Sequence, residues 1–355
     1  MKNLTLKLFS IRLCSLLLLA CITLGCENQE QDFDDFEIQN VYFPIKYPIR
    51  TISLQEDSRI DNSIDLERSF NIGVAIGGLR SNERNRVINI ALAPELVNDA
   101  FFADDERPVQ LMPSSYYTLA SNSEVTIPSG SFSGLLRVSL TDEFFNDPLA
   151  LSANYVIPLK IEPGDYDVLD GMPLDEVTDP DPRSSDDYQV NQEPRNFTLF
   201  AVKYINKYHG VYLQKGADVT LDATGSPTDT VIYNTEDLVR NILTEVFTTS
   251  LTSVATNRIG NNTGAGEYGL NLVINGNSIS ITGREDSDLN IEGSGTFLTR
   301  DDQGAEIWGE ESRKTMFLEY TYTDTNGANH RVNDTLVFRN DDLRFEEFNI
   351  ILSED

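Results

Sequence analysis

Cys26 is the residue of this chain whose surroundings point most directly to a chemical step. It follows Gly25, and before them come a basic start and an apolar run over residues 13–24. That layout is typical of a secretory signal peptide, and a small residue directly before a cysteine is typical of a thioether-linked lipid attachment site. We expect residues 1–25 to be the signal peptide and Cys26 to carry the lipid, with Cys21 as the alternative.

Cysteine and histidine are too scarce for most nucleophilic or metal chemistry. All the cysteines lie in the leader, so the mature chain has no thiol for a disulfide, a zinc site or a nucleophile. The two histidines are His209 and His330, and no G-x-S-x-G, H-E-x-x-H or phosphate-binding glycine loop accompanies them. His209 precedes Gly210 at an expected strand end, which favours a structural hydrogen bond. We expect no catalytic residue, no metal and no cofactor.

The acidic composition leaves other chemistry open. Asp and Glu number 57 against 27 Lys and Arg, a net charge of -30, which makes nucleic acid an improbable partner. A glycoside hydrolase needs only two carboxylates, but nothing here singles out one pair. The densest acidic group includes Asp179, Asp181, Asp186 and Asp187, where calcium binding is the alternative to a solvated linker.

Aromatic residues are the remaining candidates for a ligand site. Proteins that bind sugars without catalysis stack an aromatic ring on the apolar face of the sugar. Trp308 is the only tryptophan and lies beside turn-forming residues, so a rim position and a core position are both open. Tyr204, Tyr208 and Tyr212 recur at a spacing of four, which in a strand places them on one face together, either in a core or as a stacking platform. With His209 they form the candidate ligand-binding set.

The first half of the mature chain has the pattern of short strands. Apolar and polar residues alternate between Val41 and Ile161, as in 70–76, 88–92 and 155–161. Turn signals such as Gly77-Gly78 interrupt these runs at close spacing, which favours an antiparallel sandwich. We expect a tether over residues 26–40 and a β-sandwich over residues 41–162.

The second half begins after a segment without apolar periodicity. Residues 163–196 are acidic and proline-rich and predict a linker or an exposed loop. From Phe197 onward strands return, and Asn275-Gly276 predicts a tight hairpin. Residues 236–254 are ambiguous between helix and strand, with strand favoured from Leu243. Many strands without a long helix favour a closed antiparallel barrel over residues 197–355, with a second sandwich as the alternative.

Several short motifs resemble the N-terminal module of a two-domain family of Bacteroidetes surface lipoproteins. They are Val41-Tyr42-Phe43-Pro44, Arg50-Thr51, Gly77-Gly78, Pro113-Ser114-Ser115-Tyr116-Tyr117, Val125-Thr126-Ile127-Pro128-Ser129-Gly130, Leu140-Thr141-Asp142-Glu143-Phe144-Phe145, Pro148-Leu149-Ala150 and Tyr155-Val156-Ile157-Pro158-Leu159. Lys203-Tyr204-Ile205-Asn206-Lys207-Tyr208-His209-Gly210 resembles the opening of the second module. The resemblance spans nearly the whole mature chain.

The resemblance implies an all-β chain with an immunoglobulin-like β-sandwich followed by a lipocalin-like barrel. It also implies an outer-membrane, cell-surface location beside Sus-type glycan uptake systems, whose transporter proteins are then the expected partners. Members of this family are mostly of unknown function. The hypothesis is a non-catalytic lipoprotein that binds oligosaccharide or polysaccharide; the alternatives are a structural or protein-docking module and a glycoside hydrolase.

Overall fold

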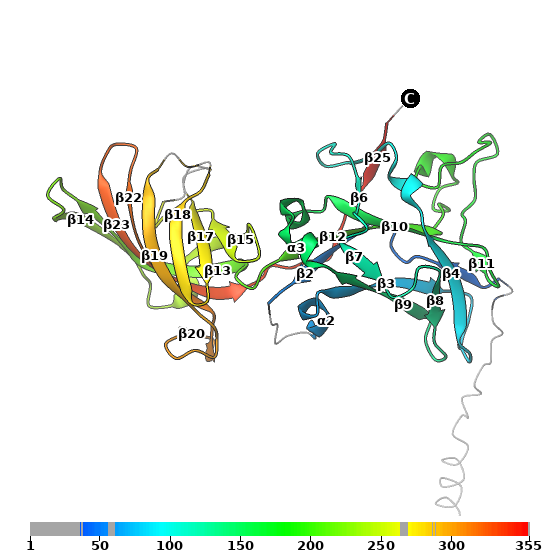
Figure 1. Ribbon diagram of the computed structural model, residues 1–355, viewed down its shortest axis with the longest axis horizontal. Helices are drawn as coiled ribbons and strands as arrows, with labels where there is room; N and C mark the ends of the chain where they lie inside the picture. Colours follow the sequence, from blue (N-terminus) through cyan, green and yellow to red (C-terminus); the bar gives the residue numbers. More distant parts are fainter. Residues whose placement is uncertain are drawn as a thin grey trace, which may run out of the picture.

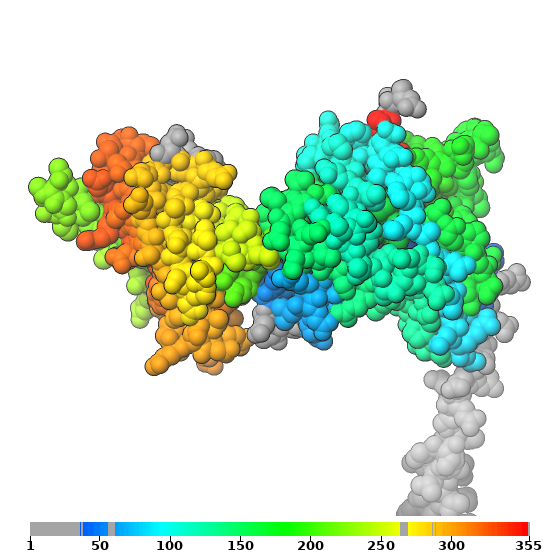
Figure 2. Space-filling view, viewed as in Figure 1, coloured from blue at the N-terminus to red at the C-terminus, as the bar shows by residue number. Residues whose placement is uncertain are grey.

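The computed structural model describes residues 36, 38–55, 61–262, 269–285, 287 and 289–353. The signal peptide and Cys26 therefore lie outside the described residues. Strands are the main regular structure of the described chain. They form two lobes, which Figure 1 shows as ribbons and Figure 2 shows as two masses joined by a narrower part. The predicted all-β class, with a sandwich followed by a closed barrel, is confirmed. None of the helices in these described ranges is long and apolar enough to cross a membrane.

The first lobe is a sandwich of two sheets. The first sheet has the order β11 (Asp167–Val168), β1 (Asn40–Tyr42), β3 (Ser69–Ile76), β9 (Ser133–Leu140) and β7 (Tyr117–Leu119). The second has the order β24 (Glu346–Glu347), β2 (Pro48–Ser53), β12 (Phe197–Ile205), β10 (Tyr155–Ile161), β4 (Arg86–Leu92) and β8 (Glu124–Ile127), with β6 (Gln110–Leu111) beside β10. Alternate residues of each strand bury their apolar side chains between the sheets, because successive side chains point to opposite faces. Short helices α2 (Ser63–Leu66) and α3 (Asp142–Asn146) lie in the connections.

The second lobe is a barrel of antiparallel strands. Its order is β14 (Pro227–Tyr233), β13 (Gly210–Leu221), β15 (Ile242–Thr248), β16 (Ser253–Thr256), β17 (Leu270–Asn275), β18 (Ser278–Gly283), β19 (Ile291–Leu298), β22 (Thr315–Thr323) and β23 (Asn329–Asn340). Pairing of β13 with β23 closes the sheet, so these strands leave no edge between them. β15 begins at Ile242, which confirms the strand interpretation of this segment after the short 3₁₀ turn η4 (Leu238–Arg240).

The predicted hairpin is also confirmed, although its two loop residues are Gly276 and Asn277, because Asn275 is still part of β17. β17 and β18 pair from Leu270 with Gly283 to Asn275 with Ser278, and Gly276 has a φ of 60°. A left-handed backbone at this position is what a two-residue hairpin turn requires and what glycine adopts without strain.

Apolar side chains fill the barrel interior. The core includes Tyr212, Phe297, Met316 and Leu318, all at most 3% exposed. Gly295 on β19 is part of this packing, because a Cβ there would approach the Leu318 side chain to 2.9 Å. The barrel is therefore a packed core that holds its side chains against one another.

The boundary between the lobes differs from the sequence prediction. β12 was expected in the barrel, but it pairs with β10 and, in parallel, with β2 inside the sandwich. The C-terminal segment also returns to the sandwich, where β24 pairs with β2 and β25 (Ile350–Leu352) pairs with β5 (Ala100–Phe102). Phe348 anchors this return, since its ring lies 5.1 Å from that of Phe102 and is 5% exposed. The barrel proper spans β13 to β23.

The segment expected as a linker or an exposed loop, residues 163–196, is mostly exposed but contacts the sandwich at several points instead of joining the two lobes. The guanidinium of Arg183 donates to the carbonyl oxygens of Leu96 and Asn98, at 3.2 and 2.5 Å. Tyr188 is 7% exposed, and β11 pairs with β1. These contacts pack Arg183 and Tyr188 against the sandwich. The sequence did not predict this packing, because acidic residues surround both of them.

Candidate binding site

A cleft opens on the side of the sandwich where β3 lacks a full-length neighbour. β1 pairs with β3 only at Ala75 and Ile76, so the stretch Asn71–Gly73 has no strand partner on that edge among the described residues. This stretch lines a cavity of about 560 Å³, together with β2 and the segment that leads from the barrel to β24. That volume is in the range of small-molecule binding sites.

The backbone of β3 supplies hydrogen-bonding groups along this edge. The amide of Ile76 donates toward the β9 side, to Phe132, whereas the amide of Gly77 donates toward β1, to Asn40. Because alternate residues of an antiparallel strand direct their N–H and C=O groups to the same side, Asn71 and Gly73 direct theirs to the open edge. The cleft therefore has both backbone donors and backbone acceptors on one wall.

The other surfaces of the cleft are mainly apolar. Phe200 of β12 lines it and stacks on Phe70, with ring centroids 5.2 Å apart and an interplanar angle of 14°. Phe345 lines it from the returning segment and is 70% exposed, an unusual exposure for a phenylalanine. One ring is thus held firmly in the floor while the other is available to a ligand.

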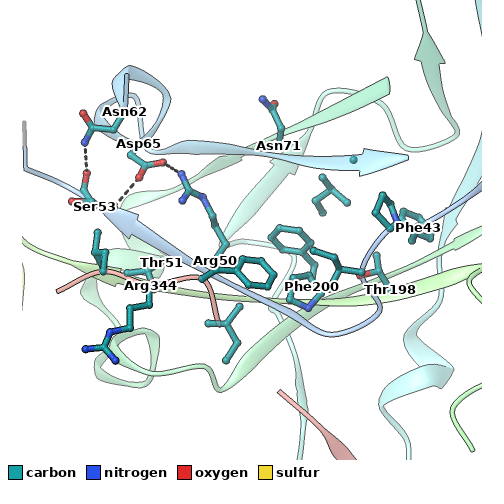
Figure 3. Close-up of a pocket in the computed structure, with 18 of the residues that line it drawn as sticks. Phe43, Arg50, Thr51, Ser53, Asn62, Asp65, Asn71, Thr198, Phe200 and Arg344 are labelled. Atoms are coloured by element: carbon teal, nitrogen blue, oxygen red, sulfur yellow. Dashed lines mark hydrogen bonds and ion pairs between the residues drawn. The ribbon is translucent and has the colours of Figure 1, made fainter. Parts of the chain in front are cut away.

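An ion pair crosses the end of the cleft nearest α2 (Figure 3). Arg50 of β2 points toward Asp65 and forms an ion pair with its Oδ1, while the amide of Ser53 donates to Asp65 Oδ2 at 3.0 Å. The Asp65 side chain is 3% exposed and burial raises the pKa of its carboxyl, although both partners oppose that shift. The Arg50 side chain is 39% exposed and uses one of its nitrogens in this pair. Its remaining N–H groups meet no acceptor within the described part of the chain.

The remaining charges around the cleft are mixed. Asp61 and Asp341 contribute two further carboxylates, and Arg344 contributes a second guanidinium that lies 3.1 Å from Asp342. Ser53 also lines the cavity, but its hydroxyl is buried and has no hydrogen-bond partner among the described residues. The lining is therefore apolar in its body, polar at its α2 end, and nearly neutral in charge.

The tyrosines proposed from the sequence do not form a stacking platform. Tyr204 lies in the sandwich core and donates its hydroxyl to the carbonyl of Phe145 at 2.9 Å. Tyr208 and Tyr212 lie in the barrel core, where the hydroxyl of Tyr212 donates to the carbonyl of Tyr208 at 2.7 Å. All three are at most 3% exposed, so the core interpretation of their spacing is the one that fits the structure.

The two histidines also have structural contacts. The amide of Thr248 donates to Nδ1 of His209 at 3.3 Å, and burial lowers the pKa of this imidazole to about 4. His330 lies 2.8 Å from Asp218 through Nδ1 and stacks on Tyr322 at a centroid distance of 4.4 Å. Neither histidine lines the cleft.

Trp308 occupies a small hairpin that projects from the barrel, formed by β20 (Ile307–Trp308) and β21 (Glu311–Ser312). It is half-buried, and the Arg313 guanidinium lies over its ring at 5.2 Å while Arg313 Nε donates to its carbonyl at 3.1 Å. Trp308 is thus outside the barrel core and outside the cleft.

The acidic side chains of residues 179–187 contact other groups of the same segment. Asp181 pairs with Arg183, and Asp187 accepts from the amide of Asp181 at 2.7 Å and from Ser184 Oγ at 3.0 Å. Within the described ranges no group of three or more His, Cys, Asp or Glu side chains has the geometry of a metal site.

Sequence reasoning missed the residues that form the cleft. Phe345 carried a signal, since it is a single aromatic residue between Arg344 and two glutamates, a setting with no periodicity that would bury it. Arg50 and Asp65 carried none, because their pairing depends on how β2 and α2 meet in space.

Comparisons with known proteins agree with two modules. Residues 36–167 match a family model described as an "N-terminal domain", and residues 207–342 match a domain of unknown function, DUF5627. No curated protein matches the chain. A crystal structure of a multidomain protein including DUF1735 from Bacteroides ovatus is 14% identical over 87% of this chain and all of that chain, with a TM-score of 0.43.

A second crystal structure, of a different Bacteroides ovatus protein whose function is unknown, is a much stronger match. It is 30% identical to this chain, covers 90% of this chain and 100% of its own, and superposes with a TM-score of 0.79. The protein therefore belongs to the same family as this Bacteroides ovatus protein, a two-module family of unknown function.

Proposed function

We propose that this protein is a non-catalytic, lipid-anchored surface protein that binds glycan fragments in the sandwich cleft. The observation that carries the proposal is the exposed ring of Phe345 beside a cavity that also contains Phe200, Arg50 and the open edge of β3.

The combination of surfaces suits a sugar. The apolar face of a pyranose ring packs on an aromatic ring, and its hydroxyls need donors and acceptors at the ring edge. Phe345 and Phe200 supply the first requirement, while Arg50 and the backbone of Gly73 supply the second. A purely apolar cleft would favour a lipid or an aromatic ligand instead.

The proposed location rests on the sequence. A lipid on Cys26 would hold the chain at the outer membrane, and the resemblance to Bacteroidetes surface lipoproteins supports a position beside Sus-type transporter proteins. The predicted lipid attachment and the family resemblance together motivate a search for partners among outer-membrane uptake complexes.

The test is a binding screen of the chain from residue 27 onward against host, plant and microbial polysaccharides, by affinity electrophoresis and calorimetry. We expect binding that Phe345→Ala weakens by about fivefold, because an aromatic contact is worth about 1 kcal/mol, with an unchanged melting temperature. Phe132→Ala is the matched control, since Phe132 is 43% exposed on the sandwich and lies outside the cleft. Absence of binding to every glycan would refute the proposal, and release of reducing ends would indicate a glycosidase.

One observation favours a structural or docking role as the second candidate. The barrel interior is filled, and the returning C-terminal segment ties the barrel to the sandwich through β24 and β25. In that role the cleft would be inert, so Phe345→Ala would leave every measured interaction unchanged.

A further inference from the structure

We infer that the cleft selects an uncharged sugar residue and that Arg50 is the residue that reads its hydroxyls. This inference rests on the proposed glycan binding and adds the class of sugar and the group that recognises it.

The cleft offers both hydrogen-bond donors and hydrogen-bond acceptors. Arg50 can only donate, whereas the backbones of Asn71 and Gly73 offer donors and acceptors on the open edge of β3. A sugar hydroxyl also donates and accepts at once, so it satisfies both kinds of group, whereas a carboxylate can only accept.

The positive charge of Arg50 is already matched by a carboxylate of the protein itself. Its guanidinium faces the buried carboxylate of Asp65, and a carboxylate on the ligand would compete with Asp65 for the same charge. The carboxylates of Asp61, Asp65 and Asp341 outnumber the two guanidiniums of the lining by one, and the whole chain has a net charge of -30. Like charges in a partly desolvated site repel each other, so an acidic sugar is disfavoured here.

The guanidinium of Arg50 has a fixed orientation. Asp65 is itself held by the amide of Ser53, so the ion pair fixes the direction of the planar guanidinium of Arg50, which lines the cleft (Figure 3). A planar donor set of this kind can bond two neighbouring hydroxyls at once, which a lysine ammonium cannot do in the same geometry. Asp65 is a positioning residue, and Arg50 is the residue that contacts the sugar.

The experiment uses a glycan array that carries neutral oligosaccharides and oligosaccharides of matched length containing uronic or sialic acid residues. We expect the bound glycans to be neutral, with affinities that change less than about twofold between low and high salt, because salt screens only charged contacts. Preferential binding of carboxylated glycans would overturn this inference and leave the proposed function standing. An array without any bound glycan would overturn both.

Two variants test the role of Arg50 on the best neutral ligand. Arg50→Lys keeps a positive charge beside Asp65 but loses the planar donor set, and we expect its affinity to fall about tenfold with little change in melting temperature. Arg137→Lys is the matched control, since Arg137 also pairs with a carboxylate, that of Glu67, has a side chain that is 45% exposed, and lies outside the cleft. Equal affinities of Arg50→Lys and the parent chain would show that Arg50 does not read the sugar.

Discussion

The hydroxyl of Tyr320 donates to Oδ2 of Asp334 at 2.8 Å in the interior of the barrel. Tyr233 donates to the other oxygen at 2.6 Å, and the amide of Gly260 donates to the Tyr320 hydroxyl at 2.7 Å. Both oxygens of a carboxylate that is 4% exposed are therefore engaged. A buried polar group in a fully connected network of this kind holds its neighbours in one arrangement.

Replacing Asp334 by asparagine should change how stability depends on pH. Burial raises the pKa of this carboxyl, although the tyrosine hydroxyls oppose the shift, so the folded state favours the neutral acid more than the unfolded state does. The stability from that preference is complete below the ordinary aspartate pKa of 3.8 and is lost as pH rises through the raised value. We expect Asp334→Asn to gain stability relative to the parent chain as pH increases from 4 upward. Urea unfolding across this range checks the sign, and a gap that shrinks with rising pH would contradict it.

Gly216 should tolerate no side chain, because the same network occupies the space beside it. A Cβ at this position would overlap the carbonyl oxygen of Asn333 and Oδ1 of Asp334. We expect Gly216→Ala to destabilise the barrel by about 1–3 kcal/mol, the usual cost of overpacking. Gly73→Ala is the control, since its Cβ would lie 3.9 Å from the nearest atom, on Leu135. Thermal unfolding of the two variants compares them, and equal melting temperatures would argue against a crowded wall.

Local patterns predicted much of this fold, and the reason is the period of the strand. Alternation decides which face of β3 or β18 is buried, and Asn275-Gly276 decides where one hairpin turns, so these elements could be predicted from neighbours in sequence. β12 does not alternate like a barrel strand, because its residues are buried on both faces, with Val202 and Tyr204 in one core and Leu199 and Ala201 in another. Its partner β2 is about 150 residues away, so the pairing itself could not be predicted from neighbours in sequence.

The cleft was missed for the same physical reason. Arg50 and Asp65 become a pair only when β2 and α2 fold toward each other, and Phe345 becomes part of the cleft only because β24 returns to β2. The tyrosine spacing of four predicted one face of one strand, but β12 ends at Ile205 and β13 begins at Gly210, so Tyr204 lies in a different core from Tyr208 and Tyr212. Spacing shows which side chains share a direction only within one strand, and it does not show where that strand ends.

His209 should make the protein less stable in mild acid. Burial lowers its pKa from 6.5 to about 4, so the folded state favours the neutral imidazole, and this stability is present above pH 6.5 and lost as pH falls toward 4. We expect the difference in unfolding free energy between the parent chain and His209→Gln to decrease by about 2 kcal/mol from pH 7.5 to pH 5. Urea titrations at both values measure it. A difference that does not depend on pH would mean that the imidazole is solvated.

Trp308 should contribute little to folding despite being the only tryptophan. Its ring lies in the projecting β20–β21 hairpin and contacts Arg313, an exposed cation–π contact worth about 0.5–1 kcal/mol. We expect Trp308→Ala to cost less than about 1 kcal/mol, whereas Phe297→Ala in the barrel core should cost about 3–5 kcal/mol. Chemical denaturation followed by circular dichroism compares the two. A cost for Trp308→Ala similar to that of Phe297→Ala would place the tryptophan in the core.

The lipid attachment site can be assigned by labelling bacteria that express the full chain with radioactive palmitate. We expect label in the parent chain and in Cys21→Ser, and none in Cys26→Ser, because only Cys26 follows a complete apolar run and directly precedes a polar segment. Since a thioether-linked diacylglycerol would be the only hold on the membrane, Cys26→Ser should also appear in the soluble fraction. Loss of label in Cys21→Ser alone would move the attachment site to Cys21. Label in neither variant nor parent would refute the proposed anchor while leaving the cleft, which folds from residue 40 onward, available for the glycan tests.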